Sequence, residues 1–97
     1  MRKRGRLDTN HPEIVNALTD IGAKVLSLAN LGNGTPDILV GFRGRLFLME
    51  IKSADYPAKL TPDEEEWHYE WAFCAMYQVP IVRTVNDALR VIGAIED

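Results

Sequence analysis

Two apolar runs separated by only two residues constrain this chain more than any other feature. Residues 37–42 and 45–52 are rich in strand-forming residues, and only Arg43 and Gly44 lie between them. A connection of this length predicts a β-hairpin with a tight turn. Both strands carry apolar residues on both faces, which is typical of strands at the buried centre of a sheet. We therefore expect helices to cover both faces of this sheet.

The register of the hairpin follows from its turn. If Phe42 lies opposite Arg45, counting back along both strands brings Asp37 opposite Glu50. Opposed residues in a hairpin have Cβ atoms roughly 4.5–5.5 Å apart. Lys52 shares the face of Glu50 because side chains alternate along a strand. The sequence thus predicts two carboxylates and one ammonium at one end of the hairpin.

This cluster predicts a metal-dependent phosphodiesterase centre. Two adjacent carboxylates repel each other unless a positive charge lies between them, and oxygen ligands with open positions suit Mg²⁺ or Mn²⁺. The alternative is a salt-bridged strand end, in which Lys52 only neutralises Asp37 and Glu50. We favour the functional interpretation, because three ionisable groups at the end of apolar strands are costly to desolvate.

Length and composition predict one globular domain that spans all 97 residues. The net charge of −3 argues weakly against sequence-independent binding of nucleic acid. The single cysteine excludes an intrachain disulfide, and no apolar run is long enough to span a membrane. We expect a cytoplasmic protein. Residues 1–9 form a basic arm, which we expect to be flexible and which carries Arg2, Lys3, Arg4 and Arg6.

The remaining pattern predicts the element order α-β-β-β-α-β-α, an α/β fold with a mixed β-sheet flanked by helices. Outside the hairpin, Thr61 followed by Pro62 and Glu64 is typical of a capped helix start. Trp67, Trp71 and Cys74 form one stripe of that helix, and we interpret the tryptophans as packing residues. The other expected elements are a helix from about residue 10 to 21, a strand at 24–28, a strand at 79–83 and a helix at 85–95.

An ordered set of motifs resembles the VRR-Nuc domain, a branch of the PD-(D/E)XK nuclease superfamily. This family includes stand-alone phage proteins and the catalytic module of the Fanconi-associated nuclease. If a phage encodes this chain, the expected location is the cytoplasm of the host cell. The resemblance extends from about Glu13 to Leu89. It rests on Gly34-Thr-Pro-Asp37, Glu50-Ile-Lys52, Leu60-Thr-Pro62, Glu64, Trp67-His68, Val79-Pro-Ile-Val-Arg83 and Asn86-Asp-Ala-Leu89.

The resemblance implies a restriction-endonuclease-like core and a specific set of site residues. It implies metal ligation by Asp37, Glu50 and the Ile51 carbonyl, with Lys52 as the catalytic lysine. It also implies an acidic residue on the first helix that faces the metal, for which Glu13 is the candidate. An alternative role for Glu13 is a favourable charge in the first turn of that helix.

Glu64 departs from the family pattern, which usually has glutamine there, so its carboxylate could bind metal or repel phosphate. Glu64 and His68 lie four residues apart, as a zinc-ligand pair would, but no third ligand accompanies them. We interpret them as a capping carboxylate and a DNA-facing or solvated histidine. The candidate DNA contacts are Ser53, Glu64, His68, Arg2, Lys3, Arg4 and Arg6, with a solubilising role as the alternative for the basic arm.

We therefore expect a structure-selective DNA endonuclease, which acts as a homodimer on branched DNA such as Holliday junctions. Lys52 can orient the attacking water or stabilise the charge that builds on phosphate, and its acidic neighbours favour the second role. No helix carries residues spaced to read base edges. Two alternatives stay open: a non-catalytic branched-DNA-binding or interaction module with a nuclease fold, and a small metal-dependent enzyme acting on nucleotides.

Overall fold

The computed structural model describes residues 10–96, and the basic arm at Arg2–Arg6 lies outside them. The chain is an α/β fold with a four-stranded mixed sheet and three helices. In the described range no helix has the length and apolar character needed to cross a membrane. The elements follow the predicted order, with one added 3₁₀ turn, as α1 (Asn10–Asp20), β1 (Lys24–Ser27), η1 (Ala29–Leu31), β2 (Ile38–Phe42), β3 (Arg45–Ile51), α2 (Pro62–Ala75), β4 (Ile81–Val82) and α3 (Val85–Val91).

The sheet has the strand order β1-β2-β3-β4, and its central hairpin has the register predicted from the sequence. Strands β1, β2 and β3 are antiparallel, whereas β4 runs parallel to β3. Phe42 pairs with Arg45 across the turn. Arg43 and Gly44 have φ angles of 51° and 81°, the left-handed values that a type I′ turn requires at both positions.

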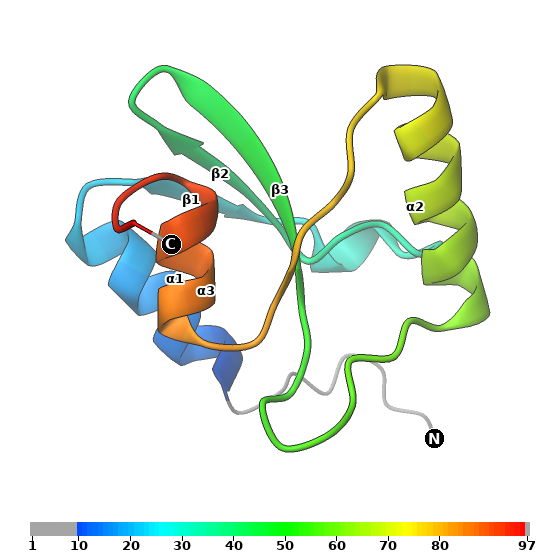
Figure 1. Cartoon of the computed structure of the whole chain (residues 1–97), viewed down its shortest axis with the longest axis horizontal. Coiled ribbons are helices and arrows are strands. Elements are labelled where there is room, and N and C mark those ends of the chain that lie inside the picture. The colour runs from blue at the N-terminus through cyan, green and yellow to red at the C-terminus, as the bar shows by residue number, and fades with distance from the viewer. Residues whose placement is uncertain (1–9, 97) are drawn as a thin grey trace.

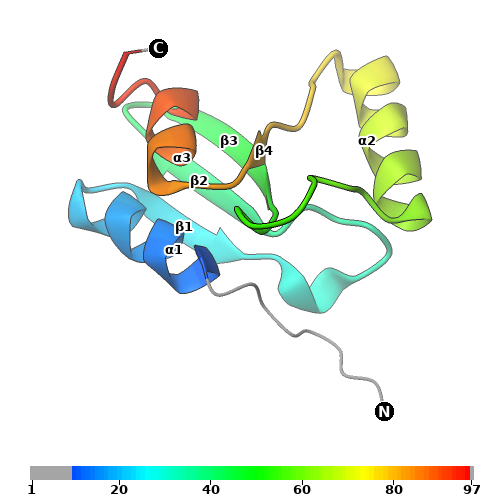
Figure 2. The same ribbon diagram turned by 60° about the horizontal axis from the view of Figure 1, so that its bottom comes forward.

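The hydrophobic core covers only one face of the sheet. Figures 1 and 2 show α1 and α3 side by side on this face, with α2 standing on the opposite side. We call the first the core face and the second the site face. The buried core side chains come from both helices and from alternate strand residues: Ile14, Leu18, Ala23, Ile38, Val40, Phe47, Met49, Ile51, Val82, Ala88 and Ile92.

Helix α2 covers the site face less closely than the sequence predicts. Its start is fixed by a capping box, in which the Thr61 hydroxyl accepts from the Glu64 N–H and the Glu64 carboxylate accepts from the Thr61 N–H. None of its residues is buried. Trp67 and Trp71 stack on each other, with ring centroids 4.7 Å apart, and Cys74 is exposed. The expected stripe therefore does not reach the core.

Gly34 holds the loop before β2 against the first turn of α2. Its φ of +81° favours glycine, and a Cβ atom there would collide with the backbone of Asp63. This close approach connects the loop that leads to Asp37 with the helix that carries Glu64. The two motifs are thus held together by backbone contact.

The last helix ends earlier than the predicted range of 85–95. Helix α3 ends at Val91, and Gly93 follows with a φ of +81°. The Gly93 and Ala94 amides donate to the carbonyl oxygens of Arg90 and Leu89, which closes the helix. Ile95 belongs to the segment beyond the helix, because the glycine in the apolar pattern terminates it.

Candidate active site

Asp37, Glu50 and Lys52 meet at one end of the hairpin on the site face. The register pairs Ile38 with Met49 on the core face, so the next residues, Asp37 and Glu50, belong to the opposite face. Glu50 is only 1% exposed, which is unusual for a carboxylate. The predicted cluster therefore forms, and its central carboxylate is buried.

Burial and the neighbouring negative charges raise the pKa of Glu50 from 4.5 to about 9, and Asp37 is the larger contributor among those charges. The Asp37 carboxylate is itself held in place, because the Ile51 N–H donates to its Oδ2 atom at 2.7 Å. Two carboxylates thus share one small volume. Such a pair gains stability from a proton or a cation between them.

The Lys52 ammonium is oriented by a second carboxylate. Its Nζ atom donates to Glu64 Oε1 at 2.8 Å and lies 3.7 Å from Glu50 Oε2. Burial opposes the charged form, but the Glu64 hydrogen bond and the surrounding carboxylates outweigh it and raise the pKa of Lys52. Burial likewise opposes ionisation of Glu64, yet the hydrogen bonds from Lys52 and the Thr61 backbone lower its pKa. Glu64 therefore positions Lys52 and caps α2 with the same oxygen.

Hydrogen bonds with α1 and β4 fix the backbone of Lys52. Its N–H donates to the Val82 carbonyl at 3.0 Å. The Asn10 side chain donates to the Lys52 carbonyl at 2.9 Å and to the Arg83 carbonyl at 2.8 Å. The sequence did not predict this role of Asn10, because a tertiary contact over 42 residues leaves no local signal.

Arg83 holds the loop that follows the site. The sequence analysis did not predict this role, and the only sign of it in the sequence is that Arg83 belongs to the Val79–Arg83 motif. Ser53, a candidate DNA contact, is half-buried, and its hydroxyl accepts from the Asp55 N–H at 3.0 Å. The guanidinium of Arg83 donates to the carbonyl oxygens of Ser53, Ala54 and Tyr56.

His68 faces the site, so of its two predicted roles, a DNA-facing or a solvated histidine, the structure disagrees with the second. Its side chain is 14% exposed, and its Nε2 atom lies 3.5 Å from Glu50 Oε1. Burial lowers the pKa of His68, an effect that the Glu64 charge partly opposes. The imidazole therefore favours its neutral form beside the buried carboxylate.

The oxygen donors of this centre fit Mg²⁺ or Mn²⁺ in type, because both ions prefer carboxylate and carbonyl ligands. Glu50 Oε1 is buried and has no hydrogen-bond partner. Within residues 10–96, however, no group of three or more His, Cys, Asp or Glu side chains is arranged to hold a metal ion. The ligands that would hold a metal ion here are therefore the Asp37 and Glu50 carboxylates, the Ile51 carbonyl and water.

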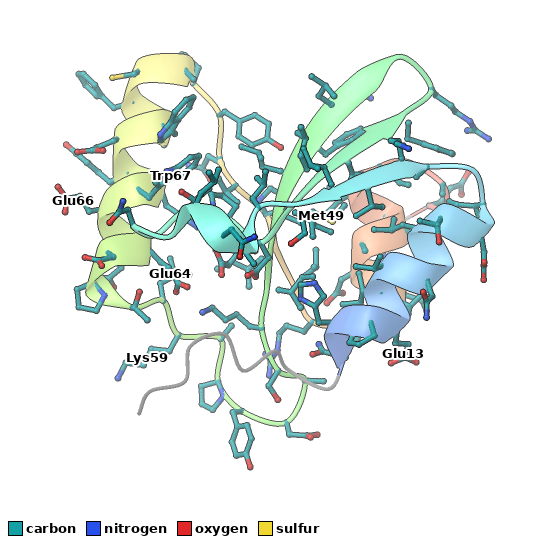
Figure 3. All side chains as sticks on the ribbon, turned by 180° about the vertical axis from the view of Figure 1, so that it is seen from behind. Glu13, Met49, Lys59, Glu64, Glu66 and Trp67 are labelled. Carbon is teal, nitrogen blue, oxygen red and sulfur yellow. The ribbon has the colours of Figure 1, made fainter. Side chains whose placement is uncertain are left out.

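Glu13 is not brought into this cluster. It is exposed in the first turn of α1, and Figure 3 shows it well away from Glu64, which lies at the start of α2 on the other side of the molecule. In the described part of the chain it makes no hydrogen bond or ion pair with Asp37, Glu50 or Lys52. Its position agrees with the alternative of a favourable charge at a helix start.

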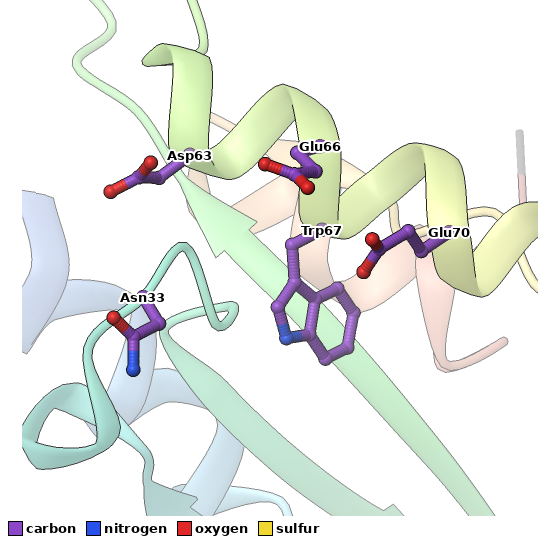
Figure 4. Close-up of a pocket in the computed structure, with 5 residues that line it drawn as sticks. All are labelled: Asn33, Asp63, Glu66, Trp67 and Glu70. Carbon is purple, nitrogen blue, oxygen red and sulfur yellow. The ribbon is translucent and has the colours of Figure 1, made fainter.

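An acidic pocket of about 260 Å³ lies on the other flank of α2 (Figure 4). Asp63, Glu66 and Glu70 line it together with Trp67 and Asn33. Its negative charge disfavours the approach of a phosphate backbone from this side. A nucleic acid would have to reach the site from elsewhere.

Comparison of the chain with protein-family models, with curated proteins and with solved structures finds no match. The interpretation of the site therefore depends on its own geometry.

Proposed function

We propose that this chain is a metal-dependent DNA endonuclease with a restriction-endonuclease-like core of the VRR-Nuc type. The observation that carries the proposal is the convergence of Asp37, Glu50 and Lys52 on the site face, with Glu50 buried beside Asp37. A purely structural salt bridge would not require a buried carboxylate next to a second one. Because burying two adjacent carboxylates away from water is costly, their presence supports a functional role.

The residues divide the work of phosphodiester hydrolysis between them. Asp37, Glu50 and the Ile51 carbonyl would hold Mg²⁺ or Mn²⁺, which supplies a Lewis acid and a more acidic water. Lys52 presents its ammonium to the non-bridging phosphate oxygens, where negative charge builds in the transition state. Its raised pKa argues against a role as general base. Glu64 keeps the ammonium on this side of the sheet.

Branched DNA is the proposed substrate, and a homodimer is the proposed active form. The site face has an apolar groove of about 330 Å³ between the sheet and α2, next to the charged cluster. The residues that line it are Leu39, Leu46, Phe47, Leu48, Trp71, Ala75 and Tyr77. Exposed apolar surface of this kind supports self-association. A two-fold dimer offers two sites to a junction with two-fold symmetry.

One observation favours the alternative of a non-catalytic DNA-binding or interaction module. The Lys52 ammonium is already paired with Glu64 at 2.8 Å, so the residue that would act on phosphate has an internal partner. Binding of branched DNA without cleavage in any divalent ion would support this alternative.

The test is cleavage of labelled four-way, flap and linear duplex DNA in Mg²⁺, Mn²⁺ or Ca²⁺, with light scattering of the same samples. We expect nicks on opposing arms of the four-way junction in Mg²⁺ and Mn²⁺. Ca²⁺ should support binding only, because its larger and looser coordination shell positions the reactants poorly. Full activity in excess chelator, or equal rates on linear and four-way DNA from a monomer, would contradict the proposal.

A further inference from the structure

His68 and Glu50 present two unpartnered buried atoms to each other. In the described structure neither His68 Nε2 nor Glu50 Oε1 has a hydrogen-bond partner, and they lie 3.5 Å apart. The side chains are 14% and 2% exposed. Buried polar atoms are nearly always satisfied in native proteins, so a facing pair of this kind needs an explanation.

A direct hydrogen bond explains the pair poorly. The separation of 3.5 Å exceeds the usual 2.7–3.2 Å of an N–H···O bond, and the contact does not qualify as one. Both atoms nevertheless point into the same small volume from two rigid elements. Glu50 lies in β3, and His68 lies one turn after Glu64, whose capping box fixes the start of α2.

We propose that His68 Nε2 and Glu50 Oε1 together bind a divalent transition-metal ion, and that His68 gives the centre a preference for Mn²⁺ over Mg²⁺. In zinc sites an imidazole nitrogen and a carboxylate oxygen lie about 2.0–2.2 Å from the ion. Two donors at such distances are roughly 3 Å apart at a right angle and roughly 3.5 Å apart at a tetrahedral angle. The observed 3.5 Å is at the upper end of this range.

The chemistry of the ligands sets the preference. Mg²⁺ and Ca²⁺ take oxygen ligands, and Mn²⁺ prefers them too, but as a first-row transition-metal ion Mn²⁺ also binds nitrogen donors. A histidine at an otherwise all-oxygen centre therefore raises the affinity for Mn²⁺ without a matching gain for Mg²⁺. This inference rests on the proposed function, because Glu50 is also a proposed ligand of the catalytic metal.

The experiment detects nitrogen on bound Mn²⁺ directly. Pulsed electron paramagnetic resonance of the full chain with Mn²⁺ alone should show ¹⁴N coupling of a bound imidazole, which ¹⁵N-histidine labelling converts to the ¹⁵N pattern. The chain has only two histidines, so His68→Gln should abolish the coupling and the control His11→Asn should retain it. Calorimetry of His68→Gln should show a Kd for Mn²⁺ raised by about tenfold or more, with the Kd for Mg²⁺ changed less than about threefold.

The outcomes separate this inference from the proposed function. Mn²⁺ binding that needs Glu50 but shows no imidazole nitrogen would overturn the role of His68 and leave the proposed centre intact. An equal loss of Mn²⁺ and Mg²⁺ affinity in His68→Gln would make His68 a residue that only positions Glu50. No Mn²⁺ binding by the wild type would overturn both proposals. If His68→Gln fails to unfold cooperatively, the labelled spectrum of His11→Asn decides, because His68 is then the one histidine in the chain.

Discussion

The two faces of the central sheet carry similar apolar residues but have different surroundings. On the core face, Ile38 and Met49 are fully buried under α1 and α3. On the site face, Leu46 is 70% exposed, and the same strands end in the buried charge cluster around Glu50. The comparison shows that an apolar strand pattern identifies a sheet centre, but it does not say which face is packed and which is left for binding.

Loss of the Lys52 ammonium should produce the largest effect on the site face. We expect Lys52→Ala to lower the rate of DNA cleavage by about 10²–10³ or more, since it removes a preorganised charge at the phosphate. Thermal unfolding should stay cooperative, because Lys52 is not part of the core cluster. The matched control is Lys59→Ala in the exposed loop (Figure 3), which should keep the rate within a few-fold. Similar rates for both variants would remove Lys52 from the mechanism.

Truncation on the core face should instead reduce stability. Ile38→Ala is expected to lower the free energy of unfolding by about 2–5 kcal/mol, because it leaves a cavity in the buried cluster. Leu46→Ala, on the same hairpin but exposed, should cost less than about 1 kcal/mol in the monomer. Urea unfolding of both variants at low protein concentration measures the difference. Equal losses would mean that both faces are packed alike.

The buried carboxylate predicts an unusual pH dependence in chelator. Glu50 has a pKa of about 9 in the fold and 4.5 as its ordinary value. Between these values the folded chain binds one more proton there than the unfolded chain, so stability falls as pH rises, by up to about 1.4 kcal/mol per pH unit. Unfolding should be measured from pH 7 to 9. The pKa values of His68 and Glu64 are lowered and that of Lys52 is raised, so these groups titrate outside this range. A stability that rises across this range would refute the assignment.

The contact between the loop and α2 should give a smaller effect. Gly34→Ala is expected to destabilise the fold by roughly 1–3 kcal/mol, because the residue has a positive φ and a Cβ would collide with Asp63. Gly93→Ala is the matched control, since Gly93 has the same φ of +81° but no neighbour within 4 Å of a Cβ. It should cost about 1 kcal/mol. Thermal melts that show the same loss for both glycines would indicate that the loop does not depend on this contact.

Local patterns were sufficient to predict the hairpin and the capped helix. The Arg43-Gly44 turn set the register from Phe42–Arg45 to Ile38–Met49, next to which Asp37 and Glu50 lie, and Thr61 with Glu64 marked the start of α2. Both are short-range effects, because a turn and a cap are determined by the few residues that form them. The strands and helices therefore appear in the predicted order.

The surroundings of the site could not be predicted, because they depend on how distant elements pack. No local pattern shows that α2 holds His68 against Glu50, or that Asn10 reaches the carbonyl of Lys52. The same limit applies to Trp67 and Trp71, which pack on each other beside the groove and not in the core. A helix can present apolar residues to a groove as well as to a core, and its sequence is similar in both cases.

The most direct test of the account is one variant, Glu50→Gln, with two measurements. A neutral amide removes a proposed metal ligand. It also removes the cost of protonating Glu50, which at pH 8 is ionised in the unfolded chain but mostly protonated in the fold. We predict that DNA cleavage in Mg²⁺ falls by at least about 10², while the free energy of unfolding at pH 8 in chelator rises by at least about 1 kcal/mol. A variant that cleaves at the wild-type rate, or that loses stability at this pH, would contradict the claim that the site face holds a buried carboxylate for metal-dependent catalysis.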